Sequence, residues 1–168
     1  MPTALAELPA IPGRFETYQT PDGVSVVVDH AHSSDSLEQV LTTIRGFATG
    51  RVITVFGCGG DRDPSKRAPM GQVAGKLSDL VIVTSDNPRT EDPDAIIDQI
   101  MPGVHATSTD VLRISDRLQA IQQALEFAQP GDVLLLAGKG AEPYLIISDR
   151  RVPFDDMQIV RDLSTPSS

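Results

Sequence analysis

The sequence predicts a three-layer α/β domain with a mostly parallel sheet, and two observations support that prediction. Short runs of apolar, largely β-branched residues alternate with segments of helical periodicity, which is the pattern of successive βαβ units. Several of these runs are apolar throughout, as expected of strands that are buried on both faces. With 168 residues and 40% hydrophobic content, the chain is long enough for one Rossmann-like domain with a substantial core.

The first elements are two strands separated by a turn. Residues 15–20 and 24–29 are the two runs, and Pro21-Asp22-Gly23 between them is a turn signal. A helix is expected at 33–47, because Ser33, Ser34 and Asp35 are residues that cap helix N-termini. Its apolar face is formed by Leu37, Val40, Leu41 and Ile44.

The rest of the chain continues the alternation, with prolines marking where two of the helices begin. In order, we expect a strand at 52–57, a helix at 66–77, a strand at 80–84, a helix at 92–100 and a short strand at 105–108. These are followed by a helix at 115–128 with Leu118, Ile121 and Leu125 on one face, a strand at 133–137, a hairpin formed by 144–148 and 151–154, and a helix at 155–163.

The ends of the chain differ in composition from the rest. Residues 1–12 are small, apolar and proline-containing, and are predicted to be a linker or the tail of a preceding central domain that this chain lacks. The folded domain is expected to span 13–163, and residues 164–168 are expected to form a disordered tail.

Composition narrows the classes of partner and compartment. A formal net charge of −9 argues against nucleic acid or an anionic membrane surface as the main partner. The single cysteine, Cys58, excludes an intrachain disulfide and fits a reducing compartment. No apolar stretch is long enough to cross a membrane, and the N-terminus has no signal-peptide pattern. We therefore expect a cytoplasmic protein without a membrane partner.

Polar loops follow three of the predicted strands, at 57–63, 86–89 and 138–142. In an open α/β sheet, ligands bind outside the carboxyl ends of the strands, so these loops are placed to hold a polar small molecule. An arginine in each of the first two loops, Arg62 and Arg89, can grip a carboxylate through two hydrogen bonds. The alternative interpretations are a tight turn, a self-neutralising cluster of surface charges, and a crossover loop with an exposed Lys139–Glu142 pair.

Other motifs favour less specific interpretations. The glycine loop lacks both the ending of a phosphate-binding P-loop and the dinucleotide fingerprint, which disfavours an oxidoreductase. The segment 29–32, Asp-His-Ala-His, can contact a metal or a nucleotide, but no further ligands complete a zinc pattern. Cys58 is explained as a small residue in a turn rather than as a nucleophile. Pro88 is expected to bias Asn87 toward an extended backbone.

Taken together, these motifs resemble the C-terminal domain of the Mur ligase family. The matching segments are 12–16, 29–36, 56–63 with Lys66-Arg67 and Met70-Gly71, 86–93, 130–132, 138–142 and 154–156. Within the family, the glycine–Asp-Arg-Asp and Asp-Asn-Pro-Arg motifs resemble the corresponding motifs of members that add meso-diaminopimelate. The sequence departs from the family pattern at His30, where tyrosine is usual, at Ser33-Ser34 in place of Thr-Pro, and at Ala141 in place of histidine.

The resemblance implies an ATP-dependent amide ligase of peptidoglycan precursor synthesis, which adds meso-diaminopimelate to UDP-N-acetylmuramoyl-L-alanyl-D-glutamate through an acyl phosphate. It implies ATP and Mg²⁺ as cofactors of the complete ligase. The implied amino-acid-binding residues are Asp86, Asn87 and Arg89 of the second loop, together with Arg62, Gly138 and Glu142. The implied nucleotide-binding residues are Arg14, Asp29, His30 and His32. No catalytic residue and no metal ligand is assigned to this chain.

Because the chain contains no phosphate-binding Gly-Lys-Thr loop, it is expected to be inactive without the N-terminal and central domains of a ligase. The alternative is a stand-alone, non-catalytic module that binds diaminopimelate or a nucleotide.

Overall fold

The computed structural model describes residues 14–164 and contains a six-stranded sheet. The strand order is β1-β2-β6-β3-β4-β5, and every neighbouring pair is parallel except β1 with β2. The strands of this sheet are β1 (Glu16–Gln19), β2 (Ser25–Asp29), β3 (Val52–Phe56), β4 (Leu80–Val83), β5 (Asp110–Arg113) and β6 (Val133–Ala137). The predicted three-layer, mostly parallel architecture is confirmed.

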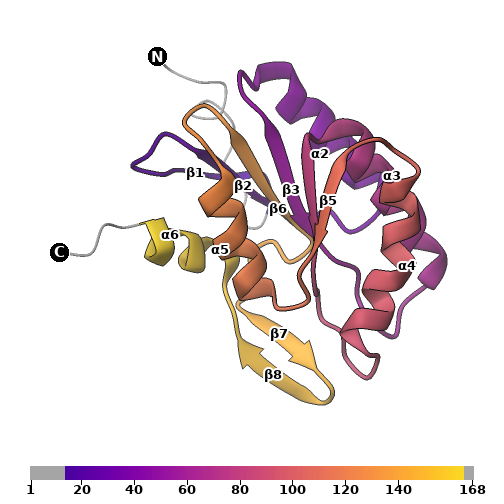
Figure 1. The fold of residues 1–168 in the computed structure, drawn as a ribbon. Helices are drawn as coiled ribbons and strands as arrows, with labels where there is room; N and C mark the ends of the chain where they lie inside the picture. The colour runs from indigo at the N-terminus through magenta and orange to yellow at the C-terminus, as the bar shows by residue number, and fades with distance from the viewer. Residues whose placement is uncertain (1–13, 165–168) are drawn as a thin grey trace.

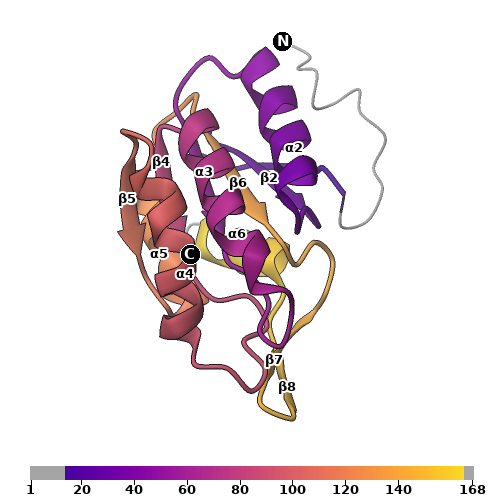
Figure 2. The same ribbon diagram turned by 90° about the vertical axis from the view of Figure 1, so that its right-hand side faces the viewer.

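Helices cover both faces of the sheet (Figures 1 and 2). One face carries α2 (Ser34–Phe47), α3 (Arg67–Leu77), which the short 3₁₀ helix η1 (Pro64–Lys66) precedes, and α4 (Pro93–His105). The other face carries α5 (Arg117–Phe127) and α6 (Asp156–Ser164). The two faces form separate apolar clusters because successive strand residues point to opposite sides: in β3, Val52 packs with α2 to α4, whereas Ile53 packs with α5 and α6.

The central strands are fully buried, as their unbroken apolar character predicts. All five residues of β3 and all five of β6 are buried. The cap of α2 also follows the sequence, because Ser33 and Ser36 form a reciprocal capping box at its N-terminus. Leu37, Leu41 and Ile44 of the predicted face are buried, and Val40 packs against the same cluster.

Two predictions for the C-terminal half are wrong. The segment 105–108 is not a strand: α4 continues to His105 with Pro102 inside it, and β5 begins only at Asp110. Proline at this position removes one backbone donor, and the helix tolerates it near its C-terminal end. Leu118 does not join the buried face of α5 and is 39% exposed, because Arg117 and Ala120 fill that face instead.

The hairpin predicted near the C-terminus is present as β7 (Tyr144–Ile147) and β8 (Arg150–Pro153), a separate two-stranded sheet. It lies beyond the carboxyl ends of the parallel strands (Figure 1). The predicted linker at 1–12 and residues 165–168 of the predicted tail lie outside the described residues, whereas Ser164 is the last residue of α6. No described helix is long and apolar enough to cross a membrane.

Candidate amino-acid-binding site

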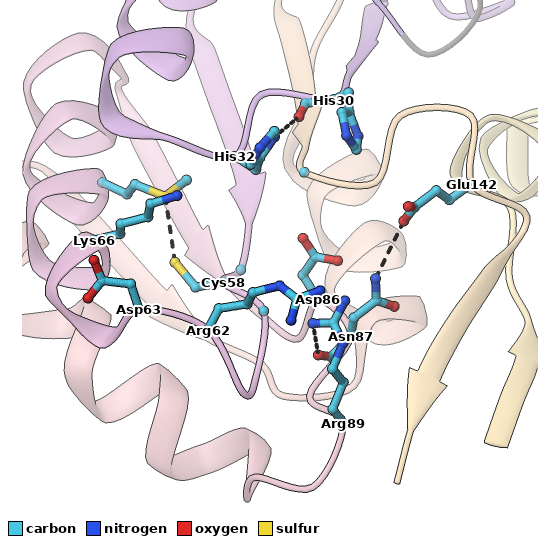
Figure 3. A pocket seen from close by; sticks show the side chains of 14 residues that line it. His30, His32, Cys58, Arg62, Asp63, Lys66, Asp86, Asn87, Arg89 and Glu142 are labelled. Carbon is cyan, nitrogen blue, oxygen red and sulfur yellow. Dashed lines mark hydrogen bonds between the residues drawn. The ribbon is translucent and has the colours of Figure 1, made fainter. Parts of the chain in front are cut away.

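A cavity of about 400 Å³ opens at the carboxyl ends of β2, β3, β4 and β6 (Figure 3). It is lined by His30, His32, Gly57, Cys58, Gly59, Arg62, Asp63, Lys66, Met70, Asp86, Asn87, Arg89, Gly138 and Glu142. The loops that follow four separate strands therefore meet in one place, as the parallel arrangement predicts.

All six residues expected to hold an amino acid line this cavity: Arg62, Asp86, Asn87, Arg89, Gly138 and Glu142. Of the four residues expected near a nucleotide, His30 and His32 line it as well. Asp29 and Arg14 do not. Arg14 is exposed, and the Asp29 carboxylate already accepts hydrogen bonds from the backbone N–H groups of Phe15 (2.7 Å) and Ala31 (2.8 Å).

The glycine loop is shaped by direct contact with the loop after β4. The backbone N–H of Gly60 donates to the carbonyl of Asn87 at 2.9 Å. A Cβ at Gly60 would lie 1.8 Å from the carbonyl oxygen of Pro88, and one at Gly57 would lie 2.2 Å from that of Thr84. Glycine is required at both positions because the two backbones approach too closely for any side chain.

Three side chains behind the cavity fasten these two loops together. Asp61 accepts from the hydroxyl of Thr90 at 2.6 Å, which is the main cause that lowers the pKa of the Asp61 carboxyl. Glu91 accepts from the backbone N–H of Asp61, also at 2.6 Å. Arg67, which is buried, donates to Glu91 at 2.7 Å and to the carbonyl of Gly59 at 3.0 Å. Asp61, which was predicted as part of a charge cluster at 61–63, therefore forms hydrogen bonds that connect the two loops.

The loop after β4 also forms hydrogen bonds with the hairpin of β7 and β8. The Asn87 side chain accepts from the N–H of Ile146 at 2.8 Å and donates to Glu142 at 3.4 Å. The Arg89 backbone donates to Ile146 and accepts from Ser148, so it forms an isolated bridge with β7. Asn87 and Arg89 adopt positive φ values of 45° and 53°. The extended backbone expected for Asn87 is therefore wrong, because pairing with the hairpin and with Gly60 imposes a left-handed conformation.

The charges inside the cavity are of both signs. Arg62 and Arg89 contribute guanidinium groups, and neither forms an ion pair with a carboxylate among residues 14–164. Arg89 uses one nitrogen to donate to the carbonyls of Gly60 (3.0 Å) and Asn87 (3.4 Å), which orients its side chain. Asp86 and Glu142 provide carboxylates on neighbouring walls. Such a set suits a zwitterion that carries carboxylate and ammonium groups.

Asp86 lies deepest among the acidic groups of the cavity. It is 7% exposed, and its carboxylate accepts no hydrogen bond from the part of the chain that the structure describes. Burial raises the pKa of the Asp86 carboxyl, and the nearby Arg117 guanidinium opposes that rise. Gly138 makes room for it, because a Cβ at that position would lie 2.5 Å from the carboxylate.

Cys58 has no features of a nucleophile. Its Sγ lies 3.7 Å from the Met70 sulfur, and this side chain of the glycine loop is buried. Burial, reinforced by Asp86, raises the pKa of the Cys58 thiol to about 12. The thiol is therefore protonated at neutral pH, in agreement with the interpretation as a small packing residue.

The sequence analysis missed the buried charges that support the third loop. Arg117 and Asp156 form a fully buried ion pair with contacts of 2.7 and 3.0 Å, and Arg117 also donates to the carbonyl of Ser85. Lys139 is not an exposed partner of Glu142, as one interpretation expected, because it is buried and donates to the carbonyls of Glu142 and Tyr144. Of these two residues, only Asp156 belongs to a motif that the sequence analysis used, and Arg117 lies 39 residues away from it in the chain.

No cluster of three or more histidine, cysteine or acidic side chains able to hold a metal occurs within residues 14–164.

Comparison with known proteins places this architecture in a family. The family model described as "Mur ligase, glutamate ligase domain" matches residues 13–140. The UDP-N-acetylmuramoyl-L-alanyl-D-glutamate--2,6-diaminopimelate ligase of Trichormus variabilis is 52% identical over 160 residues, which cover 94% of this chain and 32% of that protein. The protein of the same name from Geobacter metallireducens is 49% identical over 174 residues, and the match covers 34% of that protein's length.

A solved structure of a UDP-N-acetylmuramoyl-L-alanyl-D-glutamate--2,6-diaminopimelate ligase superimposes with a TM-score of 0.86 at 42% identity, over 94% of this chain and 32% of that one. The chain thus spans about a third of the length of the relatives it matches. The family match, the identity and the shared fold agree with one another. This chain belongs to the Mur ligase family, in which it corresponds to the C-terminal domain.

Proposed function

We propose that this chain is the amino-acid-binding and ATP-closing domain of an ATP-dependent ligase that adds meso-diaminopimelate to UDP-N-acetylmuramoyl-L-alanyl-D-glutamate in the cytoplasm. The observation that carries the proposal is the pair of cavity arginines, Arg62 and Arg89, without carboxylate partners in the described structure. The names of the relatives that are about 50% identical support the same substrates.

Diaminopimelate is complementary to such a cavity. It carries a carboxylate and an amino group at each end, so a site for it needs two cationic groups and hydrogen-bond acceptors for ammonium groups. Arg62 and Arg89 provide the cations, and Asp86 and Glu142 provide the acceptors, with Gly138 leaving space beside them. Lysine lacks the distal carboxylate, so a site that buries an arginine against that group discriminates against lysine.

Asn87 has a supporting part in this proposal. Its amide contacts Glu142 on one side and the hairpin on the other, so it fixes the acceptor while remaining at the cavity wall. Rigid support of this kind keeps binding groups in position before the ligand arrives.

The nucleotide is proposed to lie at the histidine side of the cavity, with its phosphates and Mg²⁺ held mainly by the N-terminal and central domains of the complete ligase. The exposed guanidinium of Arg14 suits a phosphate. Asp29 acts through the backbone, because its two hydrogen bonds hold Phe15, which follows Arg14, and Ala31, which separates the two histidines. The chain alone is accordingly expected to be inactive as a ligase.

Arg89→Ala tests the proposal in a complete ligase that carries this domain. Removing one partner of a desolvated charge pair costs about 2–5 kcal/mol, so we expect kcat/KM for diaminopimelate to fall by at least about 30-fold while that for lysine changes little. Arg89→Lys should restore only part of the loss, because an ammonium cannot meet both carboxylate oxygens.

Arg45→Ala is the matched control, since Arg45 forms an ion pair with Asp79 at the opposite end of the sheet. The same variants are titrated with diaminopimelate and lysine by calorimetry as isolated chains, which measures binding apart from catalysis. An unchanged diaminopimelate-to-lysine ratio in Arg89→Ala would remove the basis of the assignment.

A further inference from the structure

His32 is held in one orientation at the wall of the cavity. Its Nδ1 lies 2.9 Å from the carbonyl oxygen of His30. Because a carbonyl only accepts hydrogen bonds, Nδ1 must carry the proton. In the neutral imidazole, Nε2 then has a free lone pair, and it lies on the other side of the ring from the bonded nitrogen.

The residues on either side of His32 fix its place. The carboxylate of Asp29 accepts from the N–H of Ala31 at 2.8 Å, and Ser33 begins α2 with its capping box. The ring of His32 packs beside that of His30 with centroids 4.9 Å apart. The imidazole is therefore set by local folding rather than by a ligand.

His32 lines the cavity in which the amine of diaminopimelate is proposed to bind. His32 is exposed and lines the cavity, and in Figure 3 it lies across the cavity from Arg62 and Asp86. Within residues 14–164, Nε2 has no hydrogen-bond partner. The other titratable or charged side chains that face this cavity are His30, Cys58, Arg62, Asp63, Lys66, Asp86, Arg89 and Glu142.

The acidic groups of the cavity are engaged or buried. Asp63 accepts from both the N–H and the hydroxyl of Ser65, and Glu142 accepts from Asn87. Asp86 lies at the base of the cavity, where it is 7% exposed. His32 thus combines an accessible position with a lone pair that has no other partner in the described structure.

We propose that Nε2 of His32 accepts the proton from the amine of diaminopimelate that forms the new amide bond, an inference that rests on the proposed function. An ammonium has no lone pair and cannot attack. When the first proton passes to Nε2, the amine nitrogen attacks the carbonyl carbon of the acyl phosphate, the C–N bond forms, and the C–O bond to phosphate breaks with its electron pair leaving on phosphate. The second proton that the nitrogen loses as it becomes an amide passes to the departing phosphate. The imidazolium later returns the proton to solvent.

The first test reads the tautomer of His32 in the chain itself. The chain has three histidines, His30, His32 and His105, so ¹⁵N-histidine labelling gives three ring systems, and His32→Gln identifies one of them. We expect the Nδ1–H tautomer for His32, unchanged in His30→Gln, because that variant keeps the backbone carbonyl at 30. An Nε2–H tautomer in the native chain would overturn the proposal.

The second test measures kinetics in the complete ligase. Loss of a proton acceptor lowers rates by about 10²-fold or more, so His32→Gln should lower kcat by at least that factor with KM for diaminopimelate nearly unchanged. KM for ATP should also stay nearly unchanged, because a rise in it would show that His32 binds the nucleotide instead of accepting the proton. His105→Gln, at the exposed end of α4, should retain the wild-type kcat.

The outcomes separate this proposal from the one it rests on. If wild type uses diaminopimelate and His32→Gln keeps its kcat, the role of His32 is overturned while the substrate assignment stands. If Asp86→Asn, and not His32→Gln, lowers kcat with KM nearly unchanged, the acceptor is Asp86 and the proposal fails. If wild type does not use diaminopimelate, both proposals fall together.

Discussion

Two pairs of arginines near the carboxyl edge of the sheet differ in their partners: Arg62 and Arg89 lie in loops, whereas Arg67 and Arg117 are the first residues of α3 and α5. Arg62 and Arg89 line the cavity without an ionic partner in the described structure, whereas Arg67 and Arg117 lie in the layer behind it and are paired with Glu91 and Asp156. All four follow glycine, proline or serine turns near strand ends, and nothing in the local sequence separates them. The difference is which of them meets a carboxylate from a distant part of the chain.

The comparison shows how a binding site is identified physically. A buried cation without a partner is costly. The two buried arginines are accordingly paired with carboxylates, and buried Lys139 donates to backbone carbonyls, whereas Arg62 and Arg89 line a cavity that a ligand can reach. Arg67 joins the glycine loop to the loop after β4, and Arg117 joins the ends of β4 and β6 to α6. Arg67 and Arg117 therefore stabilise the loops that contain Arg62 and Arg89.

Breaking the pair behind the cavity should have the largest effect on stability. Arg117→Met leaves the Asp156 carboxylate fully buried without its partner, which costs about 3–5 kcal/mol in unfolding free energy. Urea unfolding followed by circular dichroism measures this, since the chain has no tryptophan. Arg117→Met combined with Asp156→Leu should recover part of the loss. A loss below about 1 kcal/mol in the single variant would contradict the assigned role.

Arg67→Met should have an intermediate effect of about 1–3 kcal/mol, because it removes the hydrogen bond to the part-buried carbonyl of Gly59. The bond from Arg67 is the main cause that lowers the pKa of Glu91 from its ordinary value of 4.5. A lowered carboxyl pKa adds stability above the ordinary value, and that stability is lost as the pH falls through the lowered one. The difference between wild type and Arg67→Met should therefore shrink below about pH 4.5, and a constant difference would exclude this contribution.

Arg62→Ala should have the smallest effect on stability, within about 0.5 kcal/mol, because the side chain is exposed and donates only to the adjacent carbonyl of Asp61 at 3.3 Å. Its effect should appear instead in the affinity for diaminopimelate, measured by calorimetry on the same sample. Destabilisation equal to that of Arg67→Met would remove the distinction between the two arginine pairs.

The prediction errors occur where long-range contacts override local preference. The strand expected at 105–108 has apolar and β-branched residues, yet α4 extends through His105 and the pairing with β4 selects 110–113 instead. Asn87 was expected to be extended because a proline follows it. Its pairing with Gly60 and Ile146 imposes a positive φ, and those partners are 27 and 59 residues away in sequence.

The sequence by itself determined the order of strands and helices and the mostly parallel sheet, because apolar periodicity and turn residues act locally. The position of three polar loops after strands predicted that they meet at one edge, and the resemblance to the family implied which six of their residues hold the amino acid. Only the tertiary structure decided which charges are paired, which lie in the cavity and how His32 is oriented. Ion pairing, burial and close backbone approach depend on residues such as Arg117 and Asp156, which only the folded chain brings together. Residue type alone does not specify such neighbours, and they set the electrostatic character of each group.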